Sequence, residues 1–144
     1  MDQIKERHVN IGKQMLAGAC LCGAINYAVA DEFLYAMNCH CSDCRKATGS
    51  AFKPFAGIER SKLQIMKGAD QIFVFGDPNL NHDVHCKLCG SFLYSVVGRD
   101  RIHVTLGTLV DSPTVGPTAH IFVADKAPWF QICDTLPQYP GHVP

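Results

Sequence analysis

Cysteine is the residue type whose number and spacing in this chain most need a chemical explanation. The 144 residues include eight cysteines, and seven of them fall into three short clusters. The first cluster is Cys20 and Cys22, the second is Cys39, Cys41 and Cys44, and the third is Cys86 and Cys89. A Cys-x-x-Cys-Gly turn, as in the third cluster, brings two thiolates to one zinc ion, and its glycine supplies a positive φ. The clusters therefore predict zinc ligation.

Ligand counting allows the cysteines to be shared between zinc sites in more than one way. A closed tetrahedral site needs four ligands, so the third cluster must be completed from elsewhere in the chain. The first cluster, also followed by a glycine, has the right number of thiols. The second cluster would then remain as three ligands with an open fourth position, which is typical of a catalytic zinc. Two alternatives stay open on spacing alone: a ribbon of Cys41, Cys44, Cys86 and Cys89, or a single structural zinc with the other thiols merely buried.

Disulfide and redox interpretations fit the sequence less well. Four disulfides would suit a secreted chain, but residues 1–8 are largely polar and charged and no apolar signal core follows them. We therefore expect a cytoplasmic protein with reduced thiols. A thioredoxin-like pair at Cys41 and Cys44 lacks the surrounding βαβ pattern, and a zinc deaminase would need a His-x-Glu motif before Pro-Cys-x-x-Cys.

Several side chains beside the clusters are candidates for work on a substrate. Arg45 and Lys46 follow Cys44 directly. They could balance the charge of the thiolates, receive a substrate carboxylate, or form a solvated helix face. His40 lies inside the second cluster, and because alternate side chains of an extended run point opposite ways, it faces away from a metal that both neighbouring sulfurs face. It is a candidate acid, base or orienting group, and His85 has the same ambiguity beside the third cluster.

The composition indicates one compact domain without a nucleic-acid or membrane partner. The chain is 47% hydrophobic and 18% charged, and thirteen Lys plus Arg balance thirteen Asp plus Glu. Zero net charge gives no basic footprint for nucleic acid, and the most apolar stretch, residues 17–30, is too short and too interrupted to span a bilayer. Trp129 and Phe130 are expected in the core or in a pocket wall, and Cys133 as a buried apolar thiol.

Short strands separated by turns predict a mostly β, antiparallel fold with one short helix. Residues 101–106 alternate between apolar and polar, and residues 71–75, 92–97 and 120–123 are rich in aromatic and β-branched side chains. The best candidate helix runs from Ser42, its expected N-cap, to Thr48, and Gly49 ends it. Thr48 and Ser50 could close this helix or donate hydrogen bonds to the second cluster. Residues 1–14 are expected as a loose polar arm, and the proline-rich tail from Pro137 onward needs no order.

Five motifs carry a resemblance to a known family. They are Gly18-Ala-Cys-Leu-Cys-Gly23, Cys39-His-Cys-Ser-Asp-Cys-Arg-Lys46, Cys86-Lys-Leu-Cys-Gly90, Gly107-Thr-Leu109 and Lys126-Ala-Pro-Trp129. In these motifs the chain resembles the glutathione-dependent formaldehyde-activating enzyme family, whose relatives include centromere protein V. The likeness covers residues 16–139 as one zinc domain, with residues 1–15 as an arm and 140–144 as a tail. It implies an Mss-four-like zinc-binding β fold with two zinc ions per chain: a structural site from the first and third clusters, and a second site from the second cluster.

The resemblance also implies an activity, the addition of glutathione to formaldehyde to give S-hydroxymethylglutathione, formally a carbon–sulfur lyase reaction in reverse. A zinc held by three thiolates is a weak Lewis acid but suits a soft fourth ligand. A small thiol such as glutathione could therefore bind there, lose its proton and attack a carbonyl carbon. The competing hypothesis is a non-catalytic binding module, in which both zinc ions only stabilise the fold and the surface recruits a protein.

Overall fold

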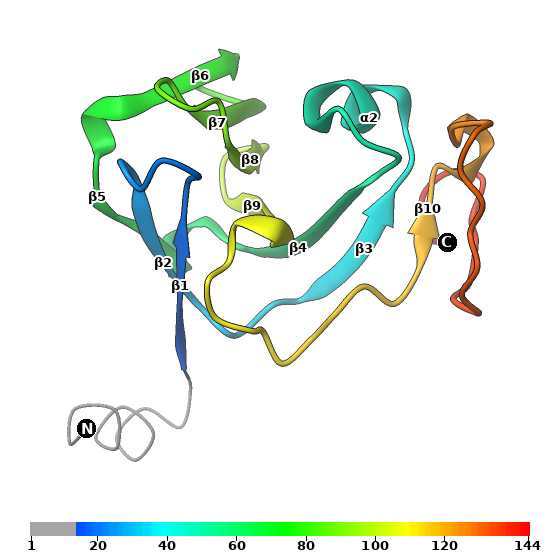
Figure 1. Ribbon diagram of the computed structural model, residues 1–144. Coiled ribbons are helices and arrows are strands. Elements are labelled where there is room, and N and C mark those ends of the chain that lie inside the picture. The colour runs from blue at the N-terminus through cyan, green and yellow to red at the C-terminus, as the bar shows by residue number, and fades with distance from the viewer. Residues whose placement is uncertain (1–13) are drawn as a thin grey trace.

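Short β-strands make up most of the structure, a computed structural model that describes residues 14–144 (Figure 1). The strands are β1 (Met15–Ala19), β2 (Asn26–Ala30), β3 (Tyr35–Cys39), β4 (Lys53–Glu59), β5 (Leu63–Lys67), β6 (Ile72–Gly76), β7 (His82–Cys86), β8 (Phe92–Val97), β9 (Arg101–Thr105) and β10 (His120–Ile121). Within these residues there is one α-helix, α2 (Ser42–Thr48), and 3-10 turns lie at Arg60–Lys62, Ala69–Gln71, Leu106–Thr108 and Val123–Asp125. The prediction of a mostly β fold with one short helix is confirmed.

The strands are divided between two sheets that enclose the main core. One sheet has the order β1-β2-β5, and the other has the order β10-β3-β4-β9-β8-β7-β6. The pairings are antiparallel, as predicted, except that β10 runs parallel to β3. The core between the sheets is made by residues such as Leu16, Tyr27 and Val29 from the smaller sheet and Ile58 and Val104 from the larger one.

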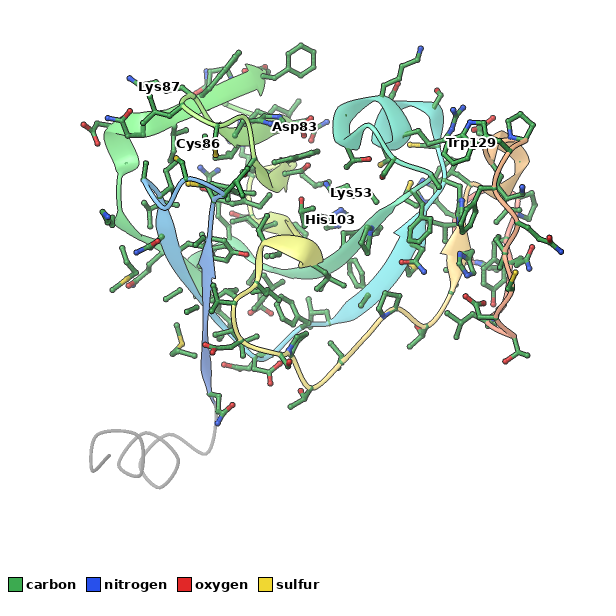
Figure 2. All side chains as sticks on the ribbon, viewed as in Figure 1. Lys53, Asp83, Cys86, Lys87, His103 and Trp129 are labelled. Atoms are coloured by element: carbon green, nitrogen blue, oxygen red, sulfur yellow. The ribbon has the colours of Figure 1, made fainter. Side chains whose placement is uncertain are left out.

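The other face of the seven-stranded sheet carries polar side chains. Cys39 pairs with Lys53 across β3 and β4, and Ser95 of β8 pairs with both His103 and Asp83. Residues directly opposite each other in antiparallel strands project to the same face, and His103 pairs with a β4 residue that shares the face of Lys53. These five residues therefore form one surface, the polar face. Figure 2 shows Lys53, His103 and Asp83 gathered in the middle of the molecule, between α2 and β9.

The start of helix α2 differs from the sequence-based expectation. The prediction that Ser42 caps the helix is wrong, because the N-cap is Cys41, whose Sγ accepts a hydrogen bond from the Cys44 N–H at 3.3 Å. Gly49 ends the helix as predicted, with a φ of 61°. Since the cap is itself a cysteine, forming the helix also brings two thiols of the second cluster together.

The C-terminal segment departs from two expectations. The strand expected over residues 120–123 ends at Ile121, because Phe122 adopts a φ of 54° and breaks the extended run. The tail from Pro137 is paired rather than loose: the His120 N–H donates to the Pro137 carbonyl at 2.8 Å, and the Tyr139 N–H donates to the His120 carbonyl at 2.9 Å. Proline lacks an N–H but keeps its carbonyl acceptor, so a proline-rich stretch can still bond to β10.

Three further expectations concern a strand, the arm and the membrane. The alternation predicted over residues 101–106 holds for the buried Ile102 and Val104 of β9, and it ends at Leu106, where a 3-10 turn starts. The expected arm lies outside the described residues except for Gln14, whose carbonyl accepts a hydrogen bond from the Asp31 N–H at 2.8 Å. Among residues 14–144, no helix combines the length and the apolar character needed to cross a bilayer.

The close contact of β1 with β2 gives a test of the packing. Gly18 lies opposite Tyr27, and a Cβ on Gly18 would overlap the Tyr27 ring. The ring cannot move aside, because it is buried and its hydroxyl lies 2.7 Å from Thr108 Oγ1. We expect Gly18→Ala to lower the free energy of unfolding by about 2 kcal/mol or more in denaturant unfolding. Gly116→Ala, where a Cβ meets nothing within 4 Å, is the matched control, and equal stability of the two variants would contradict the packing.

Candidate metal centres

Four cysteine thiols meet where the turn after β1 approaches the turn between β7 and β8. The Sγ atoms of Cys20, Cys22, Cys86 and Cys89 all lie within 4.8 Å of one another and form the four-cysteine centre. The Sγ separation is 3.7 Å between Cys20 and Cys22 and 3.8 Å between Cys22 and Cys86. A tetrahedron of sulfurs, each about 2.3 Å from a zinc ion, has edges of about 3.8 Å. This donor set therefore fits a closed site of the zinc type.

Hydrogen bonds around the four-cysteine centre favour thiolates. The Ile25 N–H donates to Cys20 Sγ at 3.2 Å, and the Ser91 hydroxyl lies 3.3 Å from Cys89 Sγ. The Ser91 side chain is the largest of the contacts that lower the pKa of Cys89 to about 5. Gly90, with a φ of 81°, allows the turn to close beside these sulfurs. These two hydrogen bonds thus favour the thiolate forms of Cys20 and Cys89, the form that a metal binds.

The second cluster of thiols forms a separate, three-cysteine centre. The Sγ atoms of Cys39, Cys41 and Cys44 lie within 4.8 Å of one another, at the end of β3 and the start of α2. Cys39 is buried, and the other two are half-buried, so solvent reaches the centre from one side. The hydrogen bond to Cys44 is the main cause that lowers the pKa of Cys39 to about 6, and the charge of Lys53 acts in the same direction. Three thiols leave a tetrahedral metal with one position to fill.

Lys53 is a residue of this centre that sequence reasoning missed. It is a cation only 4% exposed, and its Nζ donates a hydrogen bond to Ser95 Oγ at 3.0 Å, while Ser95 Oγ donates to Asp83 Oδ1 at 2.8 Å. The Nζ atom also lies 4.1 Å from the centroid of the Phe92 ring. Burial lowers the pKa of Lys53, and the charges of Cys44 and Asp83 oppose that shift. The sequence around Lys53 does not indicate that it lies near the thiols, because its pairing with Cys39 depends on the register of β3 and β4.

His40 lies apart from the thiols that flank it in the sequence. Its ring is fully buried against Phe52 and Phe130, with centroid distances of 5.0 and 6.2 Å. Its Nε2 lies 2.8 Å from His120 Nδ1, and His120 Nε2 lies 2.9 Å from Asp134 Oδ2. Burial is the main cause that lowers the pKa of His40 to about 4. The imidazole is therefore neutral at pH 7 and belongs to a hydrogen-bonded chain that links β3 to the C-terminal segment.

A cavity of about 830 Å³ opens between α2 and the β6–β7 hairpin. Lys46 of α2, Asp83 and His85 of β7, and Phe73 and Phe75 of β6 contribute to its walls. The cavity is therefore apolar on one side and charged on the other. Of the two histidines considered from the sequence, His85 is the one that faces this space, where it stacks on Phe92 with ring centroids 4.6 Å apart.

Among the other side chains considered beside α2, Thr48 and Ser50 have structural contacts and Arg45 has an unpaired group. Arg45 is half-buried, and its Nε has no hydrogen-bond partner among the described residues. Thr48 Oγ1 donates to the Cys44 carbonyl at 2.7 Å and lies 2.8 Å from Ser50 Oγ, which in turn donates to the Phe52 carbonyl at 2.7 Å. Thr48 and Ser50 thus close the helix, which was one of the two roles considered for them.

Two expectations for the C-terminal segment are wrong. Trp129, expected in the core or in a pocket wall, is 71% exposed, and Figure 2 shows it at the end of this segment nearest α2. Cys133, expected as a buried thiol, is exposed. Both lie in a surface segment without regular strand or helix. Because no strand or helix directs these side chains towards the core, their apolar character alone does not bury them. Phe130, by contrast, packs on the rings of His40 and Phe52.

His103 lies half-buried on the polar face. Its ring stacks on Phe55 with centroids 4.4 Å apart, and its Nε2 lies 2.7 Å from the Tyr35 hydroxyl. Burial is the main cause that lowers its pKa to about 4, and the nearby charges of Lys53 and Arg101 lower it further. The imidazole is therefore neutral across the physiological range.

Two comparisons with known proteins indicate one family, and a third supports the fold. Residues 15–125 match the model of the family described as glutathione-dependent formaldehyde-activating enzyme. A Halomonas elongata protein, whose name assigns this activity provisionally, is 25% identical over 130 residues, which cover 82% of this chain and 81% of that protein. A crystal structure of a Rhodobacter sphaeroides protein has a TM-score of 0.57 and 24% identity, covering 69% of this chain and 92% of that chain, and it supports the fold alone.

The lowered pKa of His103 predicts its response to acid. An unfolded histidine has a pKa of about 6.5, whereas folded His103 has a pKa of about 4. Between these two pH values, His103 is mostly protonated in the unfolded chain and mostly neutral in the folded chain. The free energy of unfolding therefore decreases as the pH falls through this window. In an NMR titration of the zinc-loaded protein, we expect the His103 ring signals to stay constant down to about pH 5, with assignment by the loss of these signals in His103→Gln. A midpoint near pH 6.5 would contradict the buried environment.

Proposed function

Because this chain belongs to the glutathione-dependent formaldehyde-activating enzyme family, we propose that it joins a small thiol to an aldehyde, with glutathione and formaldehyde as the first pair to test. The observation that carries the proposal is the three-cysteine centre, with three soft ligands, access from solvent and a charged cavity beyond α2. The reaction would be that of a carbon–sulfur lyase run in reverse. A reducing compartment such as the cytoplasm would keep the thiols free for metal.

We assign different roles to the two centres. The four-cysteine centre would hold a structural zinc, because its donor set is complete and it joins turns that belong to the two different sheets. The three-cysteine centre would hold a second zinc with an open position. When bound there, zinc would take a thiol as its fourth ligand and lower the pKa of that thiol.

The cavity supplies groups that match a zwitterionic thiol. Glutathione carries two carboxylates and one ammonium group, and the cavity walls include Lys46 and Lys87 as well as Asp43 and Asp83. The volume of about 830 Å³ lies within the usual range for small-molecule sites. Lys46 is exposed on the same helix as Cys44, so we propose it as a contact for a substrate carboxylate. Arg45 is the second candidate for that contact.

The proposed reaction balances without an oxidant or a reductant. The thiol loses its proton to solvent, and its sulfur attacks the carbonyl carbon of the aldehyde, so that a carbon–sulfur bond forms. The π electrons of the carbonyl move to the oxygen, which takes up a proton from solvent. The product is the sum of the thiol and the aldehyde, S-hydroxymethylglutathione in the case of glutathione and formaldehyde.

Serine substitutions separate the two centres. We expect Cys86→Ser to unfold the domain or strongly lower its thermal midpoint, because structural zinc supplies folding free energy on the order of 10 kcal/mol in small metal domains. Cys44→Ser should keep a midpoint much closer to that of the parent protein while thiol–aldehyde addition is lost. Thermal unfolding and an NMR assay of adduct formation give the two readouts. Equal unfolding by both substitutions would undercut the division of roles.

Thiol binding is the direct test of the proposed function. In cobalt-substituted protein, the Co²⁺ absorption spectrum reports the ligands of the metal, and glutathione should raise the thiolate-to-metal charge-transfer bands saturably in the parent protein. Cys44→Ser should lose this response. If glutathione and 2-mercaptoethanol leave the spectrum unchanged at every concentration, thiol activation is wrong, and a zinc-stabilised binding module becomes the better account.

A further inference from the structure

Lys53 raises the question of why the protein keeps a cation almost completely out of water. Burial of an ammonium group costs free energy unless nearby groups compensate for it. Its neighbour across the strands is Cys39, so its side chain leaves the sheet on the same face as a thiol of the three-cysteine centre. The Sγ atoms of Cys41 and Cys44 lie within 4.8 Å of Cys39 Sγ, and the charges of these thiols oppose the lowering of the Lys53 pKa by burial. The cation therefore lies within electrostatic reach of the whole centre.

The contacts of Lys53 hold its charge in one place. Its Nζ atom donates to Ser95 Oγ, Ser95 is itself bonded to Asp83, and the Phe92 ring lies against the ammonium group. An ammonium group has three donors, and one of them is used by these described hydrogen bonds. A long flexible side chain is thus fixed from one side.

The charge of Lys53 can be compared with the charge of a metal-loaded three-cysteine centre. Three thiolates and a divalent ion would carry a formal charge of −1, and the Lys53 ammonium would bring the sum of these groups to zero, while the Asp83 carboxylate lies on the far side of Ser95 from the ammonium group. A fourth thiolate would add another negative charge. Without a nearby cation, the incoming thiolate would meet a centre that already repels it, and in a partly dry environment such repulsion is poorly screened.

We propose that Lys53 is a positioning residue whose fixed positive charge enables the Cys39–Cys41–Cys44 centre to accept an anionic fourth ligand. The inference rests on the proposed function, since it concerns the binding of the substrate thiolate to this centre. Lys53 would then strengthen the binding of any thiolate, with or without the carboxylates that glutathione carries. The merely structural alternative is that Lys53 only satisfies Ser95 and Asp83.

The test compares thiol affinity in cobalt-substituted variants. Lys53→Met and Lys53→Gln remove the charge, Gln keeping a polar group for Ser95, and Lys53→Arg keeps the charge. The probes are glutathione and 2-mercaptoethanol, the second of which has no carboxylate. We expect both neutral variants to bind both thiols about tenfold more weakly or worse, as an opposite charge within a few ångström favours an anion by about that factor or more. Lys53→Arg should stay within about threefold of the parent protein.

Matched measurements exclude a structural cause. The cobalt content per chain and the thermal midpoint should be maintained in Lys53→Met, because methionine fills a similar space and removes a buried charge. Lys62→Met, which deletes a cation that pairs with Glu32 and Glu59 on the surface, should leave thiol affinity unchanged.

Three outcomes would overturn the inference. Unchanged thiol affinity in the neutral variants would show that the charge is not needed. Equal loss of metal or of fold in the neutral variants and in Lys53→Arg would assign Lys53 a structural role. A parent protein without any thiol response would remove the proposed function itself, and it is recognised by the failure of the unsubstituted protein rather than of the variants.

Discussion

The convergence of four thiols from two distant turns is the constraint on which the rest of the structure depends. Cys20 and Cys22 follow a strand of the three-stranded sheet, whereas Cys86 ends β7 of the seven-stranded sheet and Cys89 lies in the turn before β8. A hydrogen bond from the Leu21 N–H to Ser91 Oγ, at 2.9 Å, also joins the two turns. A metal ion held by these thiols would tie the two sheets together. With metal bound here, a domain of this size would depend less on apolar contacts for its stability.

The second centre depends on that framework through the larger sheet. The strand β3 delivers Cys39, and the helix that follows is capped by Cys41 and carries Cys44, so one short stretch provides all three thiols. The matching cation comes from the next strand, and the groups that fix this cation come from β7 and β8. The strands β7 and β8, which flank Cys86 and Cys89, thus also hold the cation that lies beside the three-cysteine centre. The two centres are separate in ligands but not independent in structure.

The sequence predicted the parts of this site that depend on local pattern. The strand over residues 92–97, the helix over residues 42–48 with its glycine end, and the short distances within each cysteine cluster all follow from neighbouring residues. What it could not predict depends on pairing between distant segments. Lys53 meets Cys39 only through the strand register, and the tail meets β10 only after the chain has crossed the sheet. The N-cap was missed because cysteine is an uncommon cap beside an available serine.

The fold brings seven thiols into two groups, one of four and one of three, and we propose that each group holds a zinc ion. The most direct measurement is the zinc content per chain, determined by native mass spectrometry on protein purified without added metal or chelator. We expect two zinc ions per chain. A single zinc ion, with the thiols of Cys39, Cys41 and Cys44 free to react with an alkylating reagent, would contradict this proposal.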